Sequence, residues 1–137
     1  MGGIPQVSRC PWLADYLAGF PGVTTDYKAE WGFLHYRVGG RIFAIICTPD
    51  ARYKEHAGRS LVTLRCDGRM SEGLREQYAD IVPGFYADHR FWISVYLDGE
   101  VPDDTLRALC AHSYDEAFSR LSKRTQREIS KLNPYEL

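Results

Sequence analysis

The sequence predicts an α+β fold of two layers, with helices packed on one face of an antiparallel sheet. Short segments in which apolar and polar residues alternate are typical of strands. A Gly-Gly pair separates two of these segments, as in a two-residue hairpin turn. A long segment after residue 102 repeats its apolar residues with the period of a helix. Helices and strands mixed in this order favour helices on one side of an antiparallel sheet.

Length and composition fit one globular domain. The chain has 137 residues, of which 45% are hydrophobic and 26% are charged, an ordinary balance for such a domain. Its net charge of -1 provides no general positive field, so nucleic-acid binding would need a local basic patch. No apolar run approaches the roughly 20 residues of a membrane helix, and residues 1–10 lack the pattern of a secretory signal. We expect a soluble cytoplasmic protein with no membrane partner, and a disordered lead over residues 1–8.

The first half of the chain is expected to hold one helix and three strands. Ser8 is placed to cap a helix that runs to about Ala18. The turn Gly39-Gly40 then joins two strands, and a polar loop long enough to be mobile or functional leads to a third. The expected strands here are residues 33–38, 41–47 and 60–66.

The second half is expected to hold a short helix, a strand and two helical segments. Ser71 is the expected cap of the short helix, and residues 91–97 form the strand. Pro102 marks the start of a long helix whose first turn carries Asp103 and Asp104, where the helix dipole favours acidic groups. Residues 122–137 read as a basic amphipathic helical extension, separable from the core.

Alternation assigns each strand a core face and an opposite face. Phe91, Ile93, Val95 and Leu97 are expected in the core, against Leu106, Leu109 and Phe118 of the long helix. The opposite face is polar and aromatic, and its expected members are His35, Arg37, Thr63, Arg65, Trp92, Ser94 and Tyr96. It reads first as a solvated sheet face, and alternatively as a stacking platform for a planar ligand or nucleic acid.

Several ordered motifs resemble the MmcQ/YjbR family. They are VGGRIFA at 38–44, LVTLRCD at 61–67 and LREQYADIVPGFYADHRFWISVYLDGEVPDDTLRALCAHSYDEAFSRL at 74–121. The resemblance implies one domain over residues 9–121, with a compact fold similar to type III secretion chaperones. It also implies DNA binding, the label that the family carries. One namesake belongs to an antibiotic biosynthetic cluster, which leaves a small-molecule role open.

The chain departs from the family pattern in the turn before the last strand. Where the family has Tyr-His-x-Asn-Lys-x-His-Trp, this chain has FYADHRFW, so the family lysine falls on His89 and the last histidine on Phe91. A positive charge is lost and Asp88 adds a negative one, although Arg90 remains. Phosphate affinity follows the number of neutralised charges. The turn is therefore better suited to form an aromatic pocket wall than a phosphate clamp.

These observations define two candidate sets of binding residues. The nucleic-acid set is Arg37, Arg65, Arg90, Arg120, Arg124, Arg127 and Lys131. The ligand set is Trp31, Phe85, Tyr86, His89, Trp92 and Tyr96, with Tyr27 or Phe33 as alternatives to Trp31.

The chain is expected to be a non-catalytic binding protein. The four cysteines sit among apolar residues at no metal-binding or redox spacing, and the four histidines are scattered, so we expect no enzyme activity, metal or cofactor. The first hypothesis is weak, largely non-specific DNA binding. The alternative is binding of an aromatic natural product or antibiotic, in resistance or biosynthesis. The oligomeric state stays open.

Overall fold

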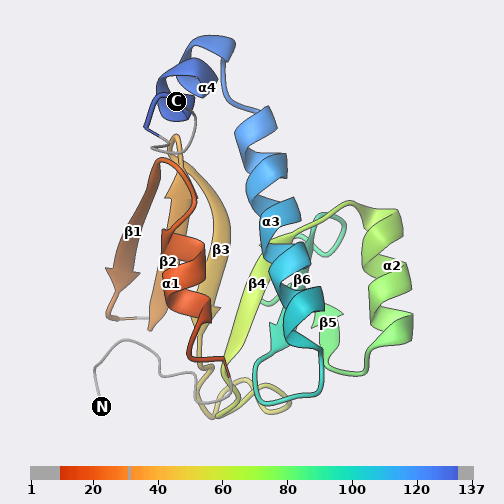
Figure 1. Cartoon of the computed structure of the whole chain (residues 1–137). Helices are drawn as coiled ribbons and strands as arrows, with labels where there is room; N and C mark the ends of the chain where they lie inside the picture. Colours follow the sequence, from red (N-terminus) through yellow and green to blue (C-terminus); the bar gives the residue numbers. More distant parts are fainter. Residues whose placement is uncertain (1–9, 31, 133–137) are drawn as a thin grey trace.

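The computed structural model describes residues 10–30 and 32–132 (Figure 1). Its six strands form one antiparallel sheet in the order β1-β2-β3-β4-β6-β5. The strands are β1 (Val23–Lys28), β2 (Phe33–Val38), β3 (Arg41–Cys47), β4 (Leu61–Arg65), β5 (Ile81–Pro83) and β6 (Trp92–Tyr96). The helices are α1 (Leu13–Ala18), α2 (Gly68–Gln77), α3 (Asp103–Ser119) and α4 (Lys123–Ser130). The predicted α+β class is confirmed, whereas the expected lead and Ser8 cap lie outside the described residues.

Helices α1 and α3 lie across one face of the sheet, and α2 packs beside β5 (Figure 1). Ile93 and Val95 of β6 are fully buried in the core that Leu106 and Leu109 of α3 share. This is the predicted core face. None of the described helices combines the length and apolarity needed to cross a bilayer.

The hairpin of β2 and β3 has the predicted bounds. Gly39 has φ of 55° and Gly40 has φ of 83°. A two-residue turn of this kind requires positive φ at both positions, which glycine adopts without steric cost. The register shifts between Tyr36 and Arg37, where a bulge bends the pair.

The structure departs from expectation in several individual elements. Strand β1 was not expected because its sequence VTTDYK lies at the sheet edge and alternates little. Helix α2 starts earlier than predicted, because the Asp67 carboxylate accepts from the N–H of Met70 at 2.8 Å and caps the helix, as aspartate commonly does. Ser71 is buried inside that helix. Phe91 precedes β6 and is 39% exposed, so it is not a core residue.

Helix α4 does not continue α3. The chain turns after Ser119, and the Ser122 hydroxyl accepts from the N–H of Thr125 at 3.1 Å, a cap that starts a new helix. Ile129 of α4 belongs to the main core, and a Cβ added to Gly22 would lie 2.9 Å from it. Helix α4 therefore contributes a side chain to the core of the domain.

Candidate ligand-binding site

The sheet face opposite α1 and α3 is covered rather than open. Thr63, Ser94 and Tyr96 were expected on an exposed face, yet all three are buried. The Thr63 and Ser94 hydroxyls lie 2.7 Å apart, and the Ser94 hydroxyl accepts from the N–H of Phe85 at 2.8 Å. Polar side chains bonded in this way tolerate burial. Both interpretations that required an exposed face, the solvated surface and the open stacking platform, were wrong over β4 and β6.

Two segments cover this face: the loop of residues 48–60, here called the covering loop, and the turn of residues 84–91. The loop is closed by a 2.7 Å hydrogen bond between the Thr48 and Ser60 hydroxyls and by the N–H of Gly58, which donates to the Pro49 carbonyl at 2.8 Å. Phe85 from the turn packs into a second apolar cluster with Cys47, Leu61 and Tyr96. The loop that the sequence marked as mobile or functional thus folds back over the sheet.

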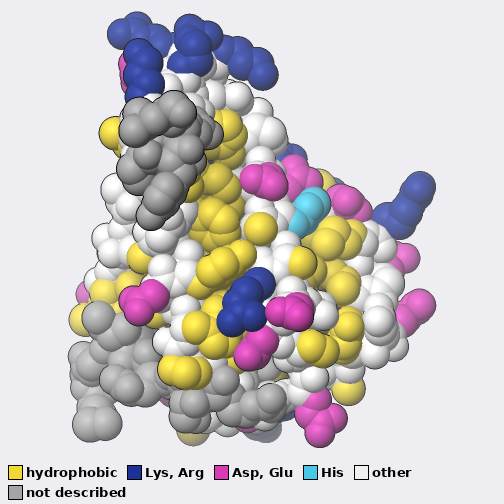
Figure 2. Space-filling model, in the orientation of Figure 1, with side chains coloured by type: hydrophobic (Ala, Val, Ile, Leu, Met, Phe, Trp, Pro, Cys, Tyr) yellow, Lys and Arg dark blue, Asp and Glu magenta, His cyan; other side chains and the backbone are white. Residues whose placement is uncertain are grey.

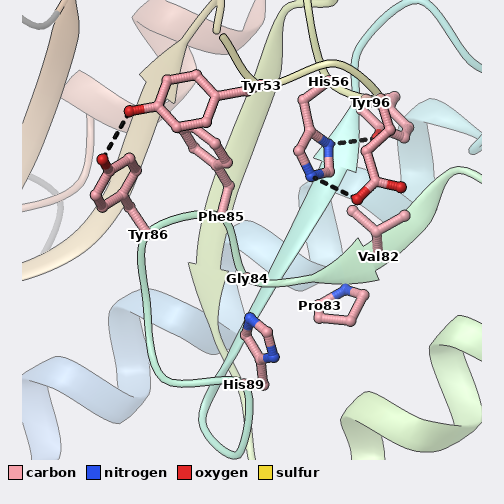
Figure 3. Close-up of a pocket in the computed structure, with 10 residues that line it drawn as sticks. Tyr53, His56, Val82, Pro83, Gly84, Phe85, Tyr86, His89 and Tyr96 are labelled. Atoms are coloured by element: carbon pink, nitrogen blue, oxygen red, sulfur yellow. Dashed lines mark hydrogen bonds and ion pairs between the residues drawn. The ribbon is translucent and has the colours of Figure 1, made fainter.

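Two cavities open between these segments and the sheet, and they share a wall. Tyr53, Phe85 and Tyr86 line both of them. The smaller cavity has a volume of about 480 Å³ and the larger about 770 Å³. Both volumes are within the range of small-molecule sites. Figure 3 shows the Tyr53 and Tyr86 hydroxyls pointing at one another, 2.6 Å apart.

The smaller cavity is bordered by a histidine and a tyrosine in direct contact (Figure 3). The Nδ1 atom of His56 lies 2.5 Å from the Tyr96 hydroxyl, and its Nε2 lies 3.8 Å from the Glu55 carboxylate. Burial raises the pKa of Tyr96, and the Arg59 guanidinium, 3.6 Å above its ring, partly opposes that shift. Arg59 is itself held by the Asp98 carboxylate at 2.7 Å. The contacts fix the loop against β6.

The larger cavity has an apolar floor on β2 and β3. Phe33, Ile42 and Ile45 contribute to it, together with the buried His35. Burial lowers the pKa of His35 although the Asp26 carboxylate, 3.7 Å away, raises it. The pKa of Asp26 is lowered, chiefly because Arg37 donates to it at 3.0 Å.

Tyr86 combines exposure with an uncommon backbone. The residue is 69% exposed and its φ is 55°. A bulky residue rarely adopts this left-handed region. A backbone conformation of this kind costs of order 1–3 kcal/mol and is found more often at functional sites. Here it places the Tyr86 ring on the wall shared by the cavities.

The structure brings together four of the six predicted ligand residues. Phe85, Tyr86, His89 and Tyr96 all line the smaller cavity. Trp92 lines neither cavity, and the Arg65 guanidinium lies 5.7 Å from its ring. Trp31 falls outside the described residues. Of its two alternatives, Phe33 lines the larger cavity and Tyr27 lines neither.

Sequence reasoning missed Tyr53 and His56, which the covering loop supplies. The available signal was the loop itself. A twelve-residue polar stretch holding one tyrosine, one histidine and a glycine is longer than most connections and is a candidate binding loop. Their partners, Tyr86 and Tyr96, are distant in sequence, so only the fold shows the pairing.

Four of the seven side chains predicted to bind nucleic acid already form ion pairs with carboxylates. The pairs are Arg37–Asp26, Arg90–Asp88, Arg120–Glu116 and Arg124–Glu128. The Arg90 pair is close enough to lower the pKa of Asp88 to about 2. Arg65, Arg127 and Lys131 have no ion pair within the described part of the chain. Figure 2 shows Lys and Arg side chains gathered at the end of the molecule that carries α4.

Residues 10–30 and 32–132 contain no group of three metal-ligating side chains. All four cysteine side chains are buried. Burial raises the pKa of Cys47 and of Cys110 to about 12, and that of Cys66 to about 11. Neutral, buried thiols are poor nucleophiles.

The YjbR family model matches residues 18–116, which include both cavities. The chain belongs to the YjbR family. It is similar to the uncharacterized protein YjbR of Escherichia coli K12, with 28% identity over 88% of this chain and 96% of that one. It also resembles the uncharacterized protein YbdF of Escherichia coli O157:H7, with 29% identity over 69% and 71% of the two chains.

Two solved structures share the YjbR-family fold. Protein DR2400 of Deinococcus radiodurans, a DUF419 domain, superimposes with a TM-score of 0.73 at 22% identity, over 86% of this chain and 85% of that one. A protein from Pseudomonas syringae gives a TM-score of 0.68 at 16% identity, over 77% and 95%. At these identities the likeness concerns the fold alone. Helix α4 lies beyond the part of the chain that the family model matches.

Proposed function

We propose that this YjbR-family chain is a non-catalytic binding protein for a small aromatic molecule, held between the covering loop and the sheet. The observation that carries the proposal is the wall of Tyr53, Phe85 and Tyr86, common to two cavities of ligand size. Aromatic rings supply large apolar contact area and prefer edge or offset stacking with a planar guest. A role in resistance to, or synthesis of, an aromatic natural product would use such a site.

The residues at the cavities favour binding over chemistry. Cys47 belongs to the same buried apolar cluster as Phe85, and its raised pKa keeps it neutral, so it is a poor nucleophile. His56 and Tyr96 bond to one another, which holds the loop in place. Their contact therefore supports a preformed pocket.

Calorimetric titration with 2-naphthylmethanol, a neutral planar probe, tests the proposal. Saturable binding is expected, and Tyr86→Ala should weaken it by roughly 2- to 12-fold, the range that one aromatic contact provides. Alanine keeps a Cβ at φ of 55°, so backbone strain is little changed. Phe91→Ala is the matched control, because Phe91 is an exposed ring of the same turn that lines neither cavity. Absence of saturable binding, or equal losses in both variants, would overturn the proposal.

The cations of α4 support weak DNA binding as a second candidate. Lys123, Arg127 and Lys131 have no carboxylate partner among the described residues. Arg41 and Arg120 lie close enough to Arg65 to lower its pKa, after the larger effect of desolvation. Unpaired cations gathered at one end can contact phosphates without reading sequence.

Charge reversal on α4 tests the DNA candidate without removing Ile129 from the core. We expect Arg127→Glu with Lys131→Glu to reduce duplex-DNA affinity and flatten its salt dependence, since log affinity falls with log salt concentration in proportion to the number of phosphates neutralised. Arg37→Gln should change little, because Arg37 already pairs with Asp26. Sequence-selective binding that survives the double reversal would contradict this charge-based candidate.

A further inference from the structure

Four aromatic rings meet beside the larger cavity, and all four line it: Phe33, Tyr53, Phe85 and Tyr86. Tyr53 lies edge to face with Phe85 at 4.9 Å between ring centroids and with Tyr86 at 5.5 Å. Phe33 contacts Phe85 and Tyr86 in the same way, at 6.2 Å and 6.1 Å. Ring faces carry negative partial charge, so a group of rings attracts organic cations, above all alkylated ammonium groups.

Among the charged residues that line the same cavity, one carboxylate has no cationic partner in the described parts of the chain. Arg52 is neutralised by Asp50, whose carboxylate lies 2.8 Å from its guanidinium. Glu30 also lines the cavity, is exposed, and pairs with no cation in the described parts of the chain. Burial keeps His35 neutral by lowering its pKa. The described lining therefore carries one net negative charge.

One cation of the protein already contacts a ring of this group. The Arg52 guanidinium carbon lies 5.5 Å from the centre of the Tyr53 ring. This separation is within the distance of cation–π contacts. The arrangement thus joins an apolar floor of Ile42 and Ile45, a set of ring faces and an unpaired carboxylate.

We infer that the larger cavity selects organic cations: molecules with a planar or apolar body and a protonated or methylated ammonium group. The body lies on the floor, and the ammonium lies against the rings and within the field of Glu30. The inference rests on the proposed function and adds the charge class of the ligand.

Three naphthalene probes that differ in charge test the inference by calorimetry on the full chain. They are (2-naphthylmethyl)trimethylammonium, 2-naphthylmethanol and 2-naphthylacetate. The ammonium probe should bind about 2- to 5-fold more tightly than the alcohol, as expected for one partly exposed cation–π contact. The carboxylate probe should bind most weakly.

Two carboxamide variants assign the preference to one cavity. Glu30→Gln should weaken binding of the ammonium probe more than binding of the uncharged alcohol, and so reduce the advantage of the ammonium probe. Glu55→Gln is the matched control, because Glu55 is an exposed carboxylate of the smaller cavity, with 87% of its side chain accessible. Phe33→Leu removes one ring at similar volume and should also reduce the advantage.

The outcomes separate the inference from the proposed function. If the alcohol probe binds saturably and the ammonium probe binds no more tightly, the inference is overturned and the proposed function stands. Loss of the advantage in Glu55→Gln but not in Glu30→Gln places the cation in the smaller cavity and also overturns it. Failure of all three probes to bind overturns both.

Discussion

The Nδ1 atom of His56 and the hydroxyl of Tyr96, 40 positions apart in the sequence, form a hydrogen bond of 2.5 Å. This bond attaches the covering loop to β6, at the edge of the smaller cavity. The shape of the cavity therefore depends on a contact between a loop residue and a strand residue whose ring is buried.

Tyr96→Phe should loosen the loop without displacing the ring. We expect a loss of about 0.5–1.5 kcal/mol in the free energy of unfolding, the net value of one hydrogen bond, by urea denaturation. Amide hydrogen exchange should accelerate in residues 53–58 and remain unchanged in α3. A variant with wild-type stability and wild-type exchange in the loop would show that the bond does not hold it.

Ser113→Ala should be costly for a substitution that removes only one oxygen atom. The buried Ser113 hydroxyl donates to the Phe43 carbonyl at 2.5 Å and accepts from the N–H of Arg65 at 2.8 Å, joining α3 to β3 and β4. Buried groups left without partners cost about 1–3 kcal/mol. Ser119→Ala, at an exposed serine whose hydroxyl bonds only within α3, is the control and should change stability by less than about 0.5 kcal/mol. Equal effects would contradict this role for Ser113.

His35 should make the fold less stable in mild acid. Its pKa is lowered in the folded chain by burial, so the unfolded chain binds the proton more readily. The stability that depends on neutral His35 is complete above the ordinary histidine pKa of about 6.5 and is lost as pH falls through that value toward the lowered one. Between about pH 7.5 and 5.5, the free energy of unfolding should fall less in His35→Gln than in the wild type. A pH dependence that is the same in His35→Gln and in the wild type would contradict this role for His35.

Local sequence signals predicted most of the fold. The Gly-Gly turn gave both strands of the hairpin their bounds, and Pro102 with two aspartates marked the start of α3. Strands β1 and β5 were not predicted, because β1 is an edge strand with weak alternation and β5 has only three residues, too few to show a period. The cap of α2 was misplaced because serine and aspartate cap equally well, and only the bond to Met70 distinguishes them.

The site was harder to predict than the fold. The aromatic turn identified Phe85, Tyr86 and His89, since its composition departs from the family pattern. The covered sheet face was misjudged, because Thr63 and Ser94 look the same in sequence whether they face water or one another. Tyr53 and His56 depend on where a long loop folds, which periodicity does not encode.

An amide-resolved NMR titration with 2-naphthylmethanol tests the central claim most directly. If the ligand lies between the covering loop and the sheet, saturable chemical-shift changes should concentrate in residues 49–58 and 82–86, with α4 unaffected. Shift changes centred on α4 or on the face covered by α1 and α3, or none that saturate, would contradict the account.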